Sequence, residues 1–208
     1  MEAIDLSIAR YIREQKEQQK QEMLRAEREK YDPKKQISYT VEELAEGVRS
    51  GTLYLYTLKL GFEKRGLFDG KFYIPFIKDF FDVMEEGPGD ILYGCNKRKV
   101  SVVIALTQCV SKVSFDGWMK QIRDSMKRMG IPMKTVKVKK TGKMEYFCHE
   151  TPTPEGKTFN ILFRYQKGKE MYTGSLNCMQ EDRDGMGLLL EALVLVAEEM
   201  NQGGSYGY

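Results

Sequence analysis

Cys148 and His149 are the residues with the clearest capacity for chemistry, and they are adjacent in the chain. A thiol beside an imidazole is the arrangement that activates a cysteine nucleophile. Both residues lie in a strand-like run over 144–149, however, and neighbouring side chains of a strand point to opposite faces. His149 is also the only histidine, which excludes sites with several histidine ligands. The sequence therefore predicts no catalytic residue, no metal site and no cofactor.

A second candidate is a run of oxygen-bearing side chains near the C-terminus. Gln180, Asp182, Asp184, Gly185 and Glu191 match positions one, three, five, six and twelve of a calcium-binding loop. Position one normally requires aspartate, and the preceding residues have a strand pattern where this loop needs a helix. An N-terminal cap at Asp184 for the last helix explains the same residues.

Other constellations are incomplete. The 19 glycines include neither G-x-x-x-x-G-K-[ST] nor a strand-linked G-x-G-x-x-G, so nucleotide binding through a phosphate loop is not supported. The carboxylate pairs Glu85-Glu86 and Glu198-Glu199 lie beside turn residues or near a helix end, where solvation is the ordinary explanation. The four cysteines contain no Cys-x-x-Cys pair, and we expect buried, reduced thiols in a cytoplasmic protein.

The distribution of charge departs more clearly from the ordinary. The net charge is only +3, but residues 97–143 contain 13 basic side chains and two acidic ones, whereas residues 181–199 contain six acidic side chains and one arginine. Folding could place the acidic segment beside the basic one, or leave a surface that binds anions. The predicted partner-binding patch consists of Lys120, Arg123, Lys127, Arg128, Lys137, Lys139 and Lys140.

The candidate residues are positioned by the helices and strands of the chain, and the spacing of hydrophobic residues indicates where each of these elements lies. Residues 1–31 lack glycine and proline and are rich in helix formers, which predicts a long N-terminal helix that Asp32-Pro33 ends. This charged helical arm, residues 1–36, precedes an α+β domain over 37–202 and a disordered tail over 203–208. The longest apolar stretch, 186–197, has about 12 residues where a membrane span needs about 20, so no span is predicted.

Within the domain, short runs rich in β-branched and aromatic residues predict a mainly antiparallel sheet flanked by helices. Thr40 and Glu43 form a capping box for a short helix over 40–50 that Gly51 ends. Lys167-Gly168 marks the clearest hairpin. The predicted strands are 52–60, 71–76, 91–95, 99–107, 133–139, 144–149, 158–166 and 169–179.

Two further helices are predicted. The first ends at Gly130-Ile131-Pro132 and has a stripe of apolar residues at helical spacing, for which core packing is favoured over a ligand groove. The last helix, over about 185–200, is apolar nearly all round and should be buried against the sheet. The stripe comprises Phe115, Trp118, Met119, Ile122, Met126 and Met129.

Over roughly residues 66–200, this order of elements resembles the PsbP/Mog/DcrB-like superfamily. The resemblance rests on Phe-Tyr-Ile-Pro at 72–75, Val-Ser-Val-Val-Ile at 100–104, Tyr-Thr-Gly-Ser-Leu at 172–176 and the final helix over 188–200. Members of this group are mostly non-enzymatic binding proteins, among them accessory subunits, a partner of a small GTPase and bacterial secretion chaperones. The resemblance therefore implies a docking role, and the helical arm lies outside it.

These observations predict a non-enzymatic, cytoplasmic protein-binding module, an adaptor or a secretion-type chaperone. Its partner is expected to be a protein, an acidic one if the basic patch is the contact, and the helical arm is suited to forming a homodimer. The alternative is a nucleic-acid-binding protein that uses the basic 97–143 surface and loses affinity steeply with salt. An unrecognised enzyme would require a deep pocket that holds a carboxylate of raised pKa.

Overall fold

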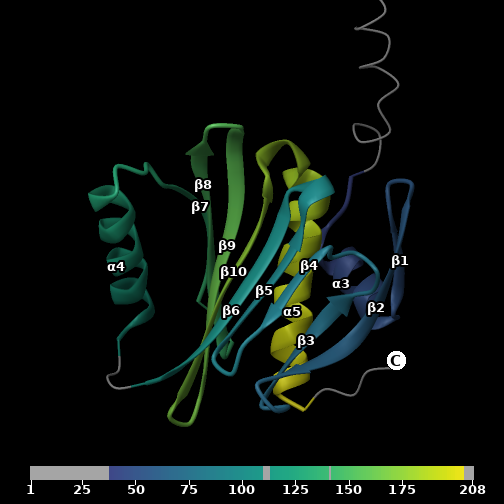
Figure 1. The fold of residues 1–208 in the computed structure, drawn as a ribbon, viewed down its shortest axis with the longest axis horizontal. Coiled ribbons are helices and arrows are strands. Elements are labelled where there is room, and N and C mark those ends of the chain that lie inside the picture. Colours follow the sequence, from purple (N-terminus) through teal and green to yellow (C-terminus); the bar gives the residue numbers. More distant parts are fainter. Residues whose placement is uncertain (1–37, 110–112, 141, 204–208) are drawn as a thin grey trace, which may run out of the picture. The chain divides into compact units, whose positions relative to one another are not determined.

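Two antiparallel sheets and three α-helices make up the described part of the chain (Figure 1). The computed structural model describes residues 38–109, 113–140 and 142–203. The predicted helical arm over 1–36, with the homodimer expected through it, and residues 204–208 of the predicted tail lie outside these residues. The predicted α+β class, with a mainly antiparallel sheet flanked by helices, is confirmed.

Seven strands form the larger sheet, and every neighbouring pair in it is antiparallel. Their order is β4-β5-β6-β10-β9-β8-β7, so β4 and β7 are the edge strands. Most predicted strands are confirmed with shifted ends, but β4 was missed. The bounds are β4 (Val83–Glu86), β5 (Asp90–Cys95), β6 (Val100–Gln108), β7 (Lys134–Lys139), β8 (Met144–Thr153), β9 (Gly156–Lys167) and β10 (Glu170–Met179).

The hairpin between β9 and β10 follows the sequence closely. Lys167 pairs with Glu170, and Gly168 adopts φ 64°, the left-handed conformation that a tight turn requires. Along β9 the predicted alternation is also confirmed, because Phe163 is buried while its neighbours Leu162 and Arg164 are half-buried on the other face. The two faces of this hairpin therefore serve different layers of the molecule.

The smaller sheet has three strands, β1 (Thr52–Leu55), β2 (Leu58–Leu67) and β3 (Phe72–Ile77). The prediction of one strand over 52–60 was wrong, because the chain reverses at Tyr56. Tyr56 adopts φ 55°, and its N–H donates a hydrogen bond to the hydroxyl of Tyr39. No glycine or asparagine signals this turn, so the apolar run reads as continuous.

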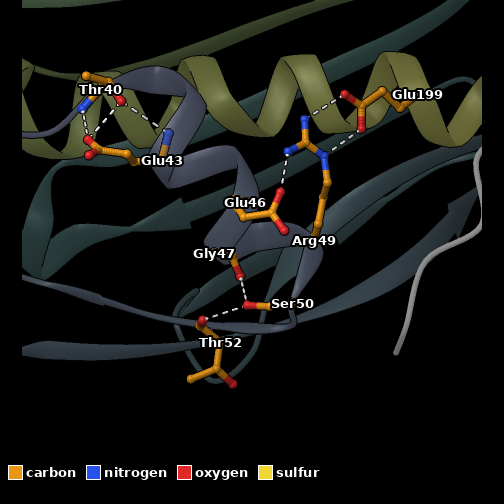
Figure 2. A network of polar contacts seen from close by, with 8 residues as sticks. All are labelled: Thr40, Glu43, Glu46, Gly47, Arg49, Ser50, Thr52 and Glu199. Carbon is orange, nitrogen blue, oxygen red and sulfur yellow. Dashed lines mark hydrogen bonds and ion pairs between the residues drawn. The ribbon is translucent and has the colours of Figure 1, made fainter.

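Helix α3 (Val41–Arg49) begins at the predicted capping box. The Thr40 hydroxyl accepts from the N–H of Glu43 at 3.2 Å, and the Glu43 carboxylate accepts from the N–H of Thr40 at 2.9 Å (Figure 2). At the other end, Arg49 donates two hydrogen bonds of 2.9 and 2.8 Å to the carboxylate of Glu199, which raises the pKa of Arg49. Because Glu199 belongs to α5, this bidentate pair ties α3 to the last helix.

Helix α5 (Leu188–Asn201) is largely buried, as its composition predicts. It starts later than expected, after a five-residue π-helical turn over Arg183–Gly187. The prediction of an N-terminal cap at Asp184 was wrong. The capping position is Gly187, so no side chain caps the first turn of α5. Gly185 in this turn meets the β1–β2 turn so closely that a Cβ would lie 2.4 Å from the hydroxyl oxygen of Tyr56.

The core lies between the larger sheet and the layer formed by α5 and the smaller sheet. At its centre Phe72 stacks on Tyr172, with ring centroids 4.7 Å apart. Cys95, Cys148 and Cys178 are free and buried, and Cys109 is half-buried. Helix α4 (Phe115–Arg128) lies on the opposite side of the larger sheet (Figure 1). Among the described residues, no helix combines the length and apolar character needed to cross a membrane.

Candidate functional site

Cys148 and His149 lie on opposite faces of β8, as strand geometry requires. Cys148 belongs to the core on the α5 side, whereas His149 packs against Phe147 on the α4 side, with ring centroids 5.6 Å apart. Burial raises the pKa of the Cys148 thiol to about 12 and lowers the pKa of His149 to about 4. Both groups are therefore uncharged at neutral pH, and the imidazole is not placed to activate the thiol.

The residues of the calcium-loop pattern do not converge on one point. Gln180 lies in a short 3-10 turn and donates to Glu150 at 3.2 Å. Glu191 lies inside α5, where it accepts a hydrogen bond from Tyr146 and pairs with Lys137. In the described ranges, no group of three or more histidine, cysteine or acidic side chains could hold a metal ion.

Three of the seven predicted basic residues are paired with carboxylates of this chain. Lys137 pairs with Glu191, and Lys139 Nζ lies 2.8 Å from Glu198 Oε2. Lys140 Nζ lies 2.7 Å from Asp116 Oδ1 on α4. The acidic side of α5 thus faces β7, so this part of the charge excess is neutralised within the fold.

Glu198 does more than pair with a lysine. Its Oε1 accepts from the backbone N–H of Lys143 at 2.7 Å and of Met144 at 3.1 Å, where β8 begins. The approach is so close that a Cβ on Gly142 would lie 2.1 Å from Oε1. Sequence reasoning treated Glu198 as solvated and did not single out Glu191 as a buried carboxylate. The available signal was their position in an otherwise apolar helix, where a charge must find partners.

The other four basic residues, Lys120, Arg123, Lys127 and Arg128, lie together on α4. All four are exposed, and Arg128 donates to the Ser125 hydroxyl at 3.0 Å. No described residue of this chain forms an ion pair with any of them. Lys120, Arg123 and Lys127 are spaced by three and four residues and so share one side of the helix.

The apolar stripe of α4 is only partly covered. The prediction that it packs into the core is confirmed for Phe115, whereas the later residues of the stripe are half-buried or exposed, because the ring contacts between α4 and the sheet come from its first turn. Periodicity shows that a helix is amphipathic but not how much of its apolar side is covered. Trp118, Met119, Ile122 and Met126 are half-buried, and Met129 is 63% exposed.

The first turn of α4 packs against two side chains of the sheet, Phe147 and Arg164, which we call the seat of α4. The ring of Phe147 on β8 lies 5.4 Å from that of Trp118 and 6.3 Å from that of Phe115. The guanidinium of Arg164 on β9 lies 5.3 Å from the ring of Phe115 and 5.6 Å from that of Trp118. Glu145 holds Arg164 through contacts of 2.8 and 2.7 Å. The sequence did not identify Phe147 and Arg164 as contacts of a helix, since the alternating pattern of the strand predicts an exposed position for a lone arginine.

A groove of about 680 Å³ opens beside this seat, between α4 and the outer face of the sheet. Trp118 and Gln121 line it from α4, and Arg164, Met171 and Thr173 line it from the sheet. Farther along the same face, Val103 on β6 is 39% exposed. We call the half-exposed stripe and its cations the α4 surface: Trp118, Met119, Lys120, Ile122, Arg123, Met126, Lys127, Arg128 and Met129.

No family model matches the sequence, and neither does any curated protein. Among solved structures, the chain is similar to the Ran-binding protein Mog1p of Saccharomyces cerevisiae, at 12% identity and a TM-score of 0.50, over 68% of this chain and 94% of that one. It is also similar to the cyanobacterial PsbP (CyanoP) of Synechocystis sp. PCC 6803, at 8% identity and a TM-score of 0.50, over 64% of this chain and 89% of that one. At such identities the likeness concerns the fold alone. The architecture expected from the order of elements is thereby confirmed, and the chain has a PsbP/Mog-like fold.

Proposed function

We propose that this protein is a non-enzymatic protein-binding module, an adaptor or a secretion-type chaperone, and that it contacts its partner through the α4 surface. The observation that carries the proposal is the half-exposed apolar stripe of α4, which ends at Met129 with 63% of that residue exposed. Apolar stripes of helices are normally covered, and exposed ones mark interaction sites. Methionine adapts to varied partners, and tryptophan is a frequent anchor of interfaces.

Two further observations support a binding role. The residues best suited to catalysis, Cys148 and His149, are buried, uncharged at neutral pH and on opposite faces of their strand. Mog1p, which has a similar fold, is a Ran-binding protein, so a protein partner is compatible with this architecture. The free, buried thiols of Cys95, Cys148 and Cys178 fit the reducing conditions of the cytoplasm, which we propose as the location.

Affinity capture of the tagged chain from its native host, with and without nuclease, tests the proposal. A Met119→Ser/Met126→Ser variant removes apolar contacts from the α4 surface, and a Tyr54→Ser/Met84→Ser variant is the matched control, since these exposed residues lie on β1 and β4. We expect a nuclease-resistant protein to be retained by the native chain and the control but lost from the α4 variant. Equal retention by all three, or no retained protein, would contradict the proposal.

Nucleic-acid binding is the second candidate, because the four cations of α4 have no carboxylate partner among the described residues. Phosphate contacts would make the affinity fall steeply between about 50 and 200 mM salt. An Arg123→Glu/Lys127→Glu variant would then bind all sequences more weakly and to the same degree. Absence of binding to single- and double-stranded oligonucleotides at about 50 mM salt would remove this candidate.

A further inference from the structure

We propose that the segment recognised by the α4 surface is an acidic amphipathic helix that lies along α4. Its apolar side would cover a methionine row, which we define as Met119, Ile122, Met126 and Met129. Its carboxylates would meet a cation row, which we define as Lys120, Arg123 and Lys127. This inference rests on the proposed function, because it names the class of partner for the same surface.

The two rows run side by side along α4. Lys120 directly follows Met119, Lys127 directly follows Met126, and each step turns the helix by about 100°. The methionine row spans about 15 Å along the helix, and the cation row borders it over about 10 Å, or two turns. A partner that covers both rows needs apolar residues on one side and carboxylates beside them, which is the pattern of an amphipathic helix.

The way α4 is held leaves these rows available. Among the described residues, the ring contacts and ion pairs that hold α4 to other elements come from its first turn, through Phe115, Asp116 and Trp118. The methionine row continues beyond this seat along the side of α4 that carries Phe115 and Trp118: Met119, Ile122 and Met126 are half-buried, and Met129 is 63% exposed. The anchored end gives the surface a defined position, and the rest of the helix offers the contact.

The charges discriminate between the possible occupants. A second copy of this chain would bring its own cation row to face Lys120, Arg123 and Lys127, and the like charges would repel. Helix α4 has only two acidic residues to offset this repulsion, and one of them, Asp116, already pairs with Lys140, which leaves Asp124. A nucleic acid would contact the cations but leave the methionine row in water. An acidic amphipathic helix satisfies both rows at once.

The test uses the full chain and a labelled designed peptide of about 18 residues, with leucines at i, i+3, i+4 and i+7 and glutamates on the flanks. Trp118 is the only tryptophan, so its emission reports binding at α4 directly. We expect saturable binding with a dissociation constant in the micromolar range, a gain of peptide helicity and a shift of Trp118 emission. The peptide should bind about tenfold more tightly than a scrambled one of the same composition. Equal binding of the two peptides, or no binding, would overturn the inference.

A charge swap gives the sharper test. An Arg123→Glu/Lys127→Glu variant should bind the acidic peptide about tenfold more weakly and should gain affinity for a version with lysines in place of the glutamates. The matched control is Lys59→Glu/Lys157→Glu, which changes the net charge equally at exposed positions of β2 and β9. Unchanged affinity in the swapped variant would show that the cation row takes no part in binding. An equal loss in the control would show that net charge, rather than the cation row, determines binding. Either outcome would overturn the inference.

A photo-cross-linking amino acid at Met129 separates this inference from the proposed function. With the partner captured from the host, the cross-linked segment should be acidic, with apolar residues at helical spacing. A cross-linked segment without that pattern would overturn the inference and leave the proposed function standing. Capture that does not depend on α4 at all would overturn the proposed function itself.

Discussion

His149 shows how burial alone determines the protonation of a side chain. It is 3% exposed, and its Nδ1 has no hydrogen-bond partner among the described residues. No carboxylate compensates an imidazolium charge there, so burial lowers the pKa to about 4. The residue that first suggested catalysis is therefore a neutral packing residue beside Phe147.

The first prediction follows from this lowered pKa. The unfolded chain binds the imidazole proton near pH 6.5 and the folded chain only near pH 4, so stability is lost as the pH falls between these values. Urea unfolding at pH 7 and at pH 4.5 should show that the native chain loses about 2 to 3 kcal/mol more than a His149→Phe variant. Carboxylates titrate in both proteins and cancel in this comparison. Identical losses would mean that His149 is accessible to protons in the folded state.

At the scale of elements, α5 and β7 are joined by carboxylates that the fold buries. The Glu191 side chain is only 3% exposed, whereas that of its partner Lys137 is 49% exposed. Tyr146 also donates to Glu191, and burial together with this carboxylate raises the pKa of Tyr146. The lysines of edge strand β7 thus neutralise carboxylates that are buried in the interior of the molecule.

Removing Lys137 should therefore cost more than removing another lysine of the same segment. We expect Lys137→Met to lower the free energy of unfolding by about 2 to 3 kcal/mol, because it leaves the Glu191 carboxylate buried without its cation. Lys140→Met is the control, since Lys140 and Asp116 are both exposed, and it should change stability by less than about 0.5 kcal/mol. A Lys137→Met/Glu191→Gln double variant should recover part of the loss. Equal effects of Lys137→Met and Lys140→Met in urea unfolding would contradict this account.

Helices α4 and α5 should also differ in their dynamics. Helix α5 is buried along most of its length, whereas α4 has one buried residue and contacts the sheet mainly through its first turn. Amide hydrogen exchange should therefore proceed at least about a hundredfold faster in 119–128 than in 189–198, because α4 can open locally without unfolding the sheet. A Phe147→Ala variant should widen the difference. Matching protection of the two helices would indicate that α4 opens only when the whole domain unfolds.

At the scale of the whole molecule, the described residues from Tyr39 onward form a compact unit by themselves. This unit contains the core around Phe72, the capping box of α3 and the bidentate contact between Arg49 and Glu199. We expect a chain that lacks residues 1–36 to fold to the same sheet. Its far-UV circular dichroism and its thermal midpoint, within about 3 °C of the full chain, would check this. Loss of cooperative unfolding would place the domain boundary elsewhere.

The sequence by itself determined the elements with strong local signals. Three features depend only on residues near one another in the chain, so the sequence predicts them without knowledge of the fold. They are the capping box at Thr40, the alternation along β9 and the glycine turn at Gly168. The turn at Tyr56 was missed because its left-handed residue is held by a distant hydroxyl, that of Tyr39. The order of elements was enough to indicate a PsbP/Mog-like architecture.

Only the tertiary structure decided which charges are free and which apolar residues are covered. Composition placed seven cations in one patch, but the fold pairs Lys137, Lys139 and Lys140 with carboxylates 24 to 59 positions away and leaves those of α4 exposed. Periodicity likewise identified the stripe from Phe115 to Met129 but not the layer that would cover it. Both outcomes depend on contacts between segments distant in the chain, which set desolvation and Coulomb energy and which no local pattern encodes.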